Sequence, residues 1–462
     1  MNRDPAPGGP RILHISPTTK LGGVSEVIRS ELPHLAELGW RARWIAANDL
    51  DEAHDAAFVL HNALYGVPVG DFPAAAVRQG VERFLAANAE RAVAAAREAD
   101  VVVLHDAMML NLATAVRSAL GPAAPVLVWR CHVGSEHLET IDRAAVDFLR
   151  PQLDAVDHLV FSHRDLVWSG WEDDPRITVV PPGIDPGSWK NRELSEEVRA
   201  AVWPYLHAAR GVSVAELTGE EDAVVEVHDF GTGGLRAPDS PFVLQVSRWD
   251  PLKGQLGVVR AFEHLAHRDA DVELVLVGPH IDDRENYPAN RRVWQGLMDA
   301  RAELPTPVRE RVHIWRFGPV RRTGEDIALN LLRRRARTVV QNSSRESFGL
   351  TVTEAMWQGA VVVGADVDGI RGQIRHEANG LLTPFTEGRP GGSAGDAGPW
   401  AETVLRSLTD GPGRARWGAA ARASVEEHHL SRAGVERQVA AFTGGPVGTP
   451  AGAESPVRAG FR

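Results

Sequence analysis

Two glutamates stand eight positions apart in the stretch "SSRESFGLTVTEAMWQG" at 343–359. An ionised carboxylate only accepts hydrogen bonds, so Glu346 and Glu354 suit pairs of sugar hydroxyls, which arrive as donors. We expect a helix to begin between them, where backbone N–H groups attract phosphate oxygens. The residues at this helix start are Phe348, Gly349, Leu350 and Thr351. A structural alternative stays open, in which Glu346 caps the helix and Glu354 is an ordinary exposed residue.

Two cations lie in the loop "VSRWDPLKGQ", where Arg248 closes an expected strand and Lys253 follows just before a helix. At the carboxyl edge of a parallel sheet, such a loop can clamp a diphosphate, with Arg as a planar fork and Lys as a point charge. The alternative is a solvated surface loop. The position at a strand end favours the clamp.

A glycine pair, Gly22 and Gly23, lies in "SPTTKLGGVSEV", between the first expected strand and a helix. Glycines let the backbone approach a ligand closely, and the helix start attracts phosphate. A turn that needs a positive φ explains the pair equally well. The dinucleotide fingerprint G-x-G-x-x-G does not occur in this turn, which argues against a dehydrogenase.

Short apolar runs alternate along the sequence with longer segments of helical periodicity. This alternation is typical of βα units around a parallel sheet, and such a sheet would position the residues named above. The expected strands are 11–16, 42–47, 101–106, 126–132, 158–163 and 177–185, then 242–248, 272–278, 312–317, 338–343 and 361–366. The pattern predicts an α/β fold with two Rossmann-like, doubly wound domains. Because ligands bind such sheets at the carboxyl ends of the strands, we expect both domains to face a central cleft.

The domain boundaries follow from where this rhythm stops. We expect a disordered N-terminus at 1–10, an N-terminal domain at 11–185, a linker with an insertion at 186–240 and a C-terminal domain at 241–427. A C-terminal helix is expected at 428–442, with its return to the N-terminal domain left open. The segment 443–462, rich in Gly and Pro, is predicted to be a disordered tail.

Composition restricts the classes of function. With 462 residues, 44% of them hydrophobic, the chain can bury two cores. Its formal charge of −11 argues against nucleic acid as a partner, because that binding needs a basic face. The single cysteine, Cys131, fits a reducing compartment, and the sequence shows neither a signal peptide nor an apolar run of about 18 residues. We expect a cytoplasmic protein without a membrane span.

Together the motifs resemble those of the retaining glycosyltransferases of family 4, which have the GT-B fold. The resemblance rests on the spacing of Glu346 and Glu354, on "SRWDPLKG", on the glycine pair and on "PPGID" at 181–185, and it covers about 11–440. The stretches "WRCH" (129–132), "QVSRWDPLKG" (245–254) and "ESFGLTVTEAMWQG" (346–359) are similar in particular to the trehalose glycosyltransferring synthases.

For the C-terminal domain, the resemblance implies a donor site. Arg248 and Lys253 would hold the diphosphate of the nucleotide sugar and neutralise it as it leaves. Glu346 would bind hydroxyls of the donor sugar, and Glu354 those of the ribose. The chain departs from the family where two glycines often follow the sixth strand, because here Asp368 precedes a single glycine. An extra carboxylate near the sugar would change the donor preference.

For the N-terminal domain, the resemblance implies an acceptor site. Gly22 and Gly23 would bring this domain against the phosphates, with Glu26 nearby. Asp106 and His132 match positions that contact the transferred sugar or its acceptor. A histidine after an apolar strand is also often a hydrogen-bonded structural residue, which is the alternative for His132. The implied catalytic set is Arg248, Lys253, Glu346 and His132.

The implied reaction moves a glucosyl-type sugar from a nucleoside diphosphate sugar, such as UDP-glucose, to a small sugar acceptor with retention of configuration. With glucose as the acceptor, the product is the 1,1-linked disaccharide trehalose. No cofactor and no metal are expected, because fixed cations and helix N-termini stabilise the departing diphosphate. The two glutamates then bind hydroxyls and are not the acid and base of a hydrolase.

Two alternatives remain open. The same chemistry could serve an aminocyclitol, a nucleoside or a sugar phosphate, and a phosphate would want a further cation such as Lys20. The chain could also be a non-catalytic protein that binds sugar nucleotides, although the four charged residues of the donor site together argue against this. A homodimer is left open as an assembly.

Overall fold

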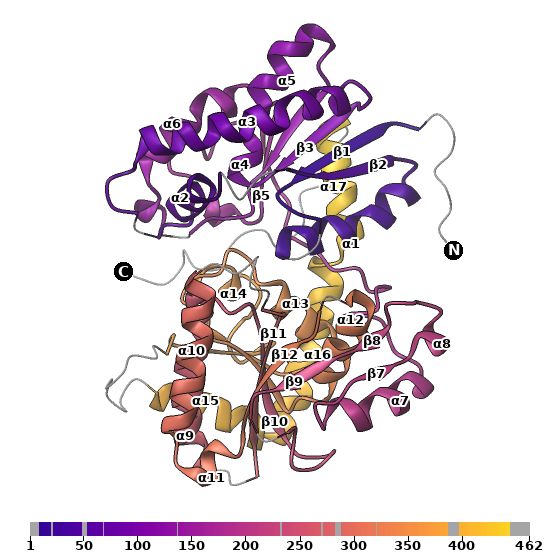
Figure 1. Cartoon of the computed structure of the whole chain (residues 1–462), viewed down its shortest axis with the longest axis vertical. Helices are drawn as coiled ribbons and strands as arrows, with labels where there is room; N and C mark the ends of the chain where they lie inside the picture. Colours follow the sequence, from indigo (N-terminus) through magenta and orange to yellow (C-terminus); the bar gives the residue numbers. More distant parts are fainter. Residues whose placement is uncertain are drawn as a thin grey trace. The chain divides into compact units, whose positions relative to one another are not determined.

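The computed structural model describes residues 9–19, 22–48, 53–67, 69–135, 137–231, 233–268, 271–281, 288–319, 321–386 and 397–443. The chain divides into two compact units, which are Met1–Asp185 with His428–Arg462 (unit 1) and Pro186–Glu427 (unit 2). Each unit is built on a largely parallel sheet with helices around it, which confirms the predicted pair of doubly wound domains (Figure 1). The expected central cleft concerns the placement of the two units and stays a prediction. The expected disordered ends lie almost wholly outside the described residues.

Unit 1 contains a six-stranded sheet in the order β2-β1-β3-β4-β5-β6, and its strands are all parallel. The strands are β1 (Arg11–Ser16), β2 (Arg41–Ala46), β3 (Val101–His105), β4 (Val126–Arg130), β5 (His158–Phe161) and β6 (Ile177–Val179). All five residues of β3 are buried, as expected of a central strand that is covered on both faces. The strand order reverses between β1 and β3, which makes their carboxyl ends the expected ligand edge.

Helices cover this sheet, and one of them comes from the far end of the chain. They are α1 (Gly23–Glu37), α2 (His54–Leu64), α3 (Ala74–Ala96), α4 (Asp106–Leu110), α5 (Leu112–Leu120), α6 (Arg143–Asp154) and α17 (Ser431–Thr443). Figure 1 shows α17, in yellow, beside α1 and β1. Val435 and Phe442 of α17 join a buried cluster with Ile12, Trp40 and Val103, so residues more than 300 positions apart share one core.

Unit 2 contains a seven-stranded sheet in the order β15-β14-β13-β10-β11-β12-β9. The strands are β9 (Val227–Asp229), β10 (Phe242–Val246), β11 (Glu273–Gly278), β12 (Val312–Phe317), β13 (Thr338–Gln341), β14 (Val362–Ala365) and β15 (Leu381–Thr383). All pairs are parallel except that β9, at one edge of the sheet, joins β12 in the antiparallel direction. Here the order reverses between β10 and β13.

The segment 186–240, which we predicted to be a linker with an insertion, is part of unit 2. It forms α7 (Glu196–Leu206), α8 (Ala215–Thr218), a small hairpin of β7 (Val212–Ser213) and β8 (Val224–Val225), and the strand β9. The physical reason is that its sparse apolar residues, among them Leu194, Val202 and Leu206, are buried within unit 2. Its mixed charge concealed these short elements from an argument based on periodicity.

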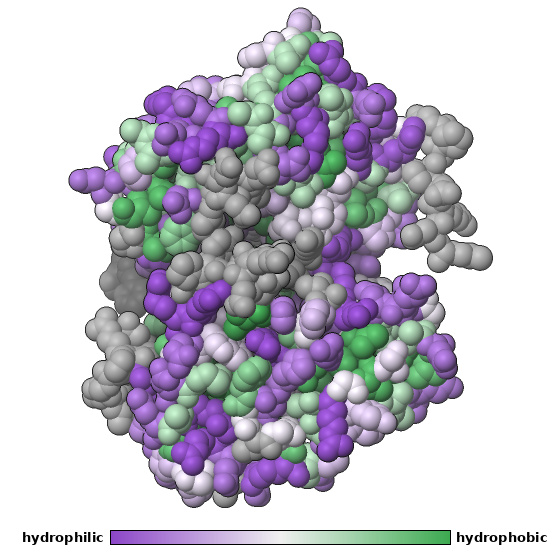
Figure 2. All heavy atoms as spheres, viewed as in Figure 1, coloured by the Kyte–Doolittle hydropathy of each residue, from purple (hydrophilic) through white to green (hydrophobic). Residues whose placement is uncertain are grey.

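The remaining helices of unit 2 pack around its sheet. They are α9 (Gln255–Ala266), α10 (Pro288–Glu303), α11 (Thr306–Arg309), α12 (Arg322–Arg335), α13 (Leu350–Trp357), α14 (Asp368–Arg371), α15 (Gly398–Thr409) and α16 (Gly411–His428). On the face seen in Figure 2, hydrophilic side chains are interspersed with small hydrophobic areas. Within the described residues, no helix combines the length and hydrophobicity needed to cross a membrane.

Candidate active site

The loop after β10 carries both predicted cations, and the side chains of two glutamines donate hydrogen bonds to its backbone. Gln245 donates to the Lys253 carbonyl (2.7 Å), and Gln255 donates to the Arg248 carbonyl (2.5 Å). Arg248 remains exposed, and its Nη2 contacts Asp250 Oδ2 at 2.7 Å. The backbone of the loop is therefore fixed, while the guanidinium of Arg248 is accessible to a ligand.

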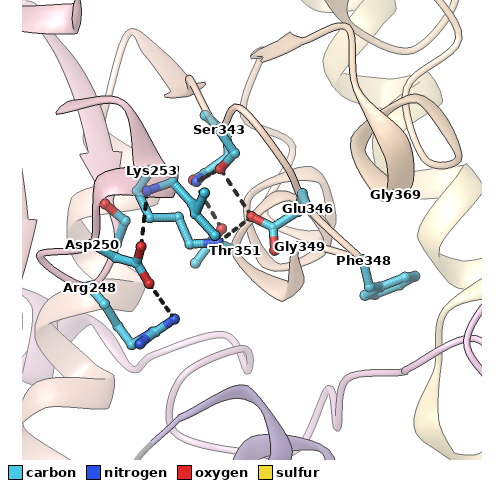
Figure 3. Close-up of polar contacts among 12 residues, drawn as sticks. Arg248, Asp250, Lys253, Ser343, Glu346, Phe348, Gly349, Thr351 and Gly369 are labelled. Atoms are coloured by element: carbon cyan, nitrogen blue, oxygen red, sulfur yellow. Dashed lines mark hydrogen bonds and ion pairs between the residues drawn. The ribbon is translucent and has the colours of Figure 1, made fainter. Parts of the chain in front are cut away.

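Lys253 and Glu346 meet although they belong to loops on opposite sides of the strand reversal. Lys253 Nζ lies 2.5 Å from Glu346 Oε2, and Ser343 donates to the same oxygen at 3.1 Å. Figure 3 shows the two charged side chains pointing toward one another, with Arg248 beside Asp250 in the same loop. Because both side chains are mostly buried, the ion pair is only partly screened by solvent. One predicted cation and one predicted hydroxyl ligand thus form a single site.

The start of α13 lies next to this pair. Gly349 precedes the helix with φ 89°, a conformation that favours glycine, and Thr351 donates to Gln341 at 3.1 Å. Phe348 is buried, and its ring points away from Lys253 and Glu346 (Figure 3). Gly369 packs so closely that a Cβ there would stand 2.5 Å from the Phe348 backbone, and its N–H donates to the Glu346 carbonyl at 2.7 Å.

Glu354 belongs to a different network from Glu346. It is buried, one carboxylate oxygen pairs with the buried Arg333, and the other lies 3.4 Å from Lys190 Nζ. The alternative that Glu354 is an ordinary exposed residue of the helix is therefore wrong. Glu354 compensates two cations inside unit 2, and its contact with ribose hydroxyls stays a prediction.

In unit 1, the glycine pair lies at the start of α1, after the strand β1. Gly22 adopts φ 101° and ψ 164°, so an L side chain would be strained there although nothing lies within 4 Å of a Cβ. Both glycines are exposed, as a close approach to a ligand requires. Glu26 lies in the first turn of α1, 3.6 Å from Arg29. Lys20 and the side chain of Asp368 lie outside the described residues.

Asp106 and His132 follow the neighbouring strands β3 and β4. Asp106 has φ 75°, in the left-handed region that is costly for a non-glycine residue. Burial opposes its ionisation, but the contact with His61, whose Nδ1 lies 3.9 Å from Oδ2, and the nearby His132 lower the pKa of Asp106 to about 2. Burial and the charge of Arg130 lower the pKa of His132 to about 3. The site therefore presents a carboxylate and a neutral imidazole.

Comparisons with known proteins bear on both units. Residues 14–167 match the family model described as "Trehalose synthase, N-terminal domain", and residues 240–410 match "Glycosyl transferases group 1". A trehalose synthase from Rubrobacter xylanophilus is 30% identical over 381 residues, which are 82% of this chain and 80% of that protein. The chain belongs to the trehalose synthase family of glycosyltransferases. The resemblance inferred from the sequence motifs is confirmed.

Solved structures show the GT-B fold of this glycosyltransferase. An α,α-trehalose-phosphate synthase from Burkholderia xenovorans in complex with glucose-6-phosphate has a TM-score of 0.67 at 16% identity, covering 94% of this chain and 100% of the other. A structure described as trehalose-6-phosphate from E. coli bound with UDP-2-fluoro glucose has a TM-score of 0.66 at 16% identity, covering 94% and 98%. The predicted fold is confirmed.

Sequence reasoning missed several residues of this glycosyltransferase. Arg333 was one of three successive arginines, and no pattern distinguishes it from Arg334 and Arg335, which are less buried. Lys190 lay in the segment that we took for a linker. His14 contacts His105, which in turn contacts His132. Both had a weak signal, since each is a polar residue within an apolar strand. Where the structure describes the chain, no group of three His, Cys, Asp or Glu residues could hold a metal ion.

Proposed function

We propose that this glycosyltransferase moves a glucosyl group from a nucleoside diphosphate glucose to the anomeric hydroxyl of free glucose, with the α configuration retained. The product is trehalose. The observation that carries the proposal is the contact between Lys253 and Glu346 across the strand reversal of unit 2, in a chain whose relatives include trehalose synthases. It joins a phosphate-binding cation to a carboxylate that binds sugar hydroxyls.

Breaking the bond to the diphosphate develops positive charge on the sugar ring and negative charge on the leaving group. Arg248 and Lys253 neutralise the departing diphosphate, and the N-terminus of α13 adds its backbone N–H groups. Glu346 orients the ammonium of Lys253 and accepts hydrogen bonds from sugar hydroxyls. These fixed charges do the work that a metal ion does elsewhere, so we infer that no metal and no further cofactor is required.

The acceptor in this proposal is held by unit 1, where Asp106 accepts hydrogen bonds and His132 contacts a sugar hydroxyl. The departing phosphate serves as the base, since the neutral His132 has a pKa of about 3 and Asp106 one of about 2. UDP-glucose is the first donor to test, because a solved structure of the same fold is described with UDP-2-fluoro glucose.

The test is a matrix of donors and acceptors read by mass spectrometry, with EDTA in one half of the reactions. Donors are UDP-, ADP- and GDP-glucose, and acceptors are glucose, glucose 6-phosphate, an inositol phosphate and an aminocyclitol. We expect a disaccharide with glucose in both halves. A product only with the phosphorylated acceptors or the aminocyclitol would refute the glucose acceptor, and loss of product in EDTA would refute metal independence. Donor hydrolysis without any transfer would refute the proposed transfer.

A further inference from the structure

A chain of three histidines crosses the sheet of unit 1 and ends at the predicted acceptor site. His14 Nδ1 lies 2.9 Å from His105 Nε2, and His105 Nδ1 lies 2.9 Å from His132 Nε2. The ring centroids are 5.2 Å apart at both steps. The first two rings are fully buried, and His132 is partly exposed.

Strand register explains why the rings meet. His14 pairs with Val103 of β3, and His105 lies two residues further along, on the same face of the sheet. His105 pairs in turn with Arg130 of β4, and His132 lies two residues beyond Arg130. Each ring is therefore displaced by one pleat toward the carboxyl edge, and the chain runs diagonally from the core to that edge.

All three rings are neutral. Burial and the charge of Arg130 lower the pKa of His14 and of His132 to about 3, and burial with the neighbouring rings holds the pKa of His105 well below its usual range. Arg130 is itself paired with Glu31 at 2.6 Å, so it stays buried and charged beside the rings. A neutral imidazole has one N–H donor and one acceptor nitrogen, so both hydrogen bonds must run in the same direction.

The buried end of the histidine chain selects the direction. Within the described residues, the buried Nε2 of His14 has no hydrogen-bond partner, and buried N–H groups without a partner are rare, so its proton is placed on Nδ1. At the other end, His105 faces Nε2 of His132, so Nδ1 is the nitrogen of His132 that stays open to a ligand. His14 then donates to His105, and His105 donates to Nε2 of His132.

We propose that His14 and His105 are positioning residues that fix His132 as the Nδ1–H tautomer, so that it donates a hydrogen bond to a sugar hydroxyl oxygen and does not act as a base. This inference rests on the proposed function only in placing a sugar at His132. The opposite direction of the chain would give His132 an unprotonated Nδ1, which is the tautomer that a general base needs. The two possibilities therefore differ at one observable proton.

The first test is ¹⁵N NMR of the ligand-free full chain labelled at histidine, with His132 assigned by the signal that His132→Gln removes. We expect a protonated, pyrrole-type Nδ1 and an unprotonated, pyridine-type Nε2. A protonated Nε2, or an average of both tautomers, would overturn the proposal. Because no substrate is present, this result does not depend on which product the enzyme forms.

The second test uses variants of His14, at the buried end of the three histidines. His14→Leu removes the first donor, and we expect mixed His132 tautomers and roughly a tenfold loss of kcat/KM with a normal circular dichroism spectrum. The amide of His14→Gln can still donate to His105 and should restore both. His158→Gln, on β5 and outside the chain, is the matched control. An unchanged His132 tautomer in folded His14→Leu would remove His14 from the proposal.

Discussion

The ion pair between Lys253 and Glu346 fixes the positions of both side chains. Their charged atoms lie 2.5 Å apart, so each holds the other in a single geometry before a ligand arrives. In the proposed reaction, a diphosphate at Lys253 would add negative charge next to Glu346, and a hydroxyl of the sugar would offset this charge by donating to the carboxylate. We therefore propose that the pair couples the position of the leaving group to the position of the sugar.

Removing either predicted cation should slow transfer without unfolding the protein. For Arg248→Ala and Lys253→Ala, we expect kcat/KM to fall roughly 10²-fold or more, because each removes preorganised stabilisation of the leaving diphosphate. Steady-state kinetics with thermal unfolding in parallel checks this. Arg268→Ala, which removes an exposed cation near Glu402, is the control and should keep full activity. Wild-type turnover in both test variants would contradict the clamp.

The two glutamates should separate in a binding experiment. Glu346→Gln should keep the affinity for free UDP while turnover with saturating donor falls, because its carboxylate acts on the sugar. Glu354→Gln should weaken UDP binding and also lower the free energy of unfolding by about 3–5 kcal/mol, since it leaves the buried Arg333 without its counter-charge. Calorimetry and denaturant unfolding measure both effects. If Glu346→Gln lost its affinity for UDP while Glu354→Gln kept it, the two proposed roles would have to be exchanged.

The sequence could nominate candidate side chains for the chemistry but could not predict their partners. The spacing of Glu346 and Glu354 suggested two similar ligands of hydroxyls. Their different networks depend on Lys190 and Arg333, which lie more than 20 positions away from Glu354 and reach it only through the fold. Pairings between distant positions leave no local pattern.

Elements position the site through the order of the strands. In unit 1 the strand order reverses between β1 and β3, and in unit 2 it reverses between β10 and β13. The predicted residues follow these four strands or, for His132, the next one. Strand positions could be predicted because buried parallel strands are continuous apolar runs. The short elements between 186 and 240 could not, because two or three residues do not establish a period.

A buried triad should make the stability of unit 2 depend on pH. His313 on β12 lies 2.8 Å from Glu273 and 3.3 Å from Asp229, and the hydrogen bonds and charges of these carboxylates outweigh burial and raise its pKa. Stabilisation by protonated His313 is complete below its unfolded pKa of about 6.5 and is lost as the pH rises through the higher folded value. The pKa values of Asp229 and Glu273 are lowered, so the stabilisation that these ionised carboxylates contribute is lost only in acid.

We therefore expect His313→Gln to lower the free energy of unfolding by about 3–5 kcal/mol at pH 6, because it removes the buried cation between two carboxylates, and by less at alkaline pH. Denaturant unfolding at several pH values measures the difference. His228→Gln, an exposed histidine of the neighbouring strand β9, provides the control. A loss that grows as the pH rises would contradict the sign of this argument.

The helix α17 should be required for the stability of unit 1. Phe442 is buried against the core of β1, β3 and β4, and Gln438 donates to the buried Glu31 at 2.8 Å. Phe442→Ala should lower the stability of unit 1 by about 3–5 kcal/mol. Hydrogen exchange of peptides from β1 and β3 reads this out, with Val439→Ala as a milder comparison. Unchanged protection in β1 would show that the helix is dispensable.

The whole molecule is one chain whose two units share a plan but not a sequence. Its formal charge of −11 fits a protein that binds phosphate at local sites and not along a basic face. The rhythm of strands and helices predicted two doubly wound sheets, and the family follows from motifs in both units. That rhythm predicted a C-terminal helix but left open its return to unit 1, because the closing contact is tertiary and joins opposite ends of the chain; in the structure α17 does return to unit 1.

The proposed reaction transfers glucose, with its α configuration retained, to the anomeric hydroxyl of a second glucose. The most direct measurement is ¹H and ¹³C NMR of the disaccharide purified from a reaction with UDP-glucose and uniformly ¹³C-labelled glucose. We expect a non-reducing product with two α-anomeric signals, one from the labelled and one from the unlabelled ring. A free reducing end, or a β-anomeric signal from the transferred ring, would contradict it.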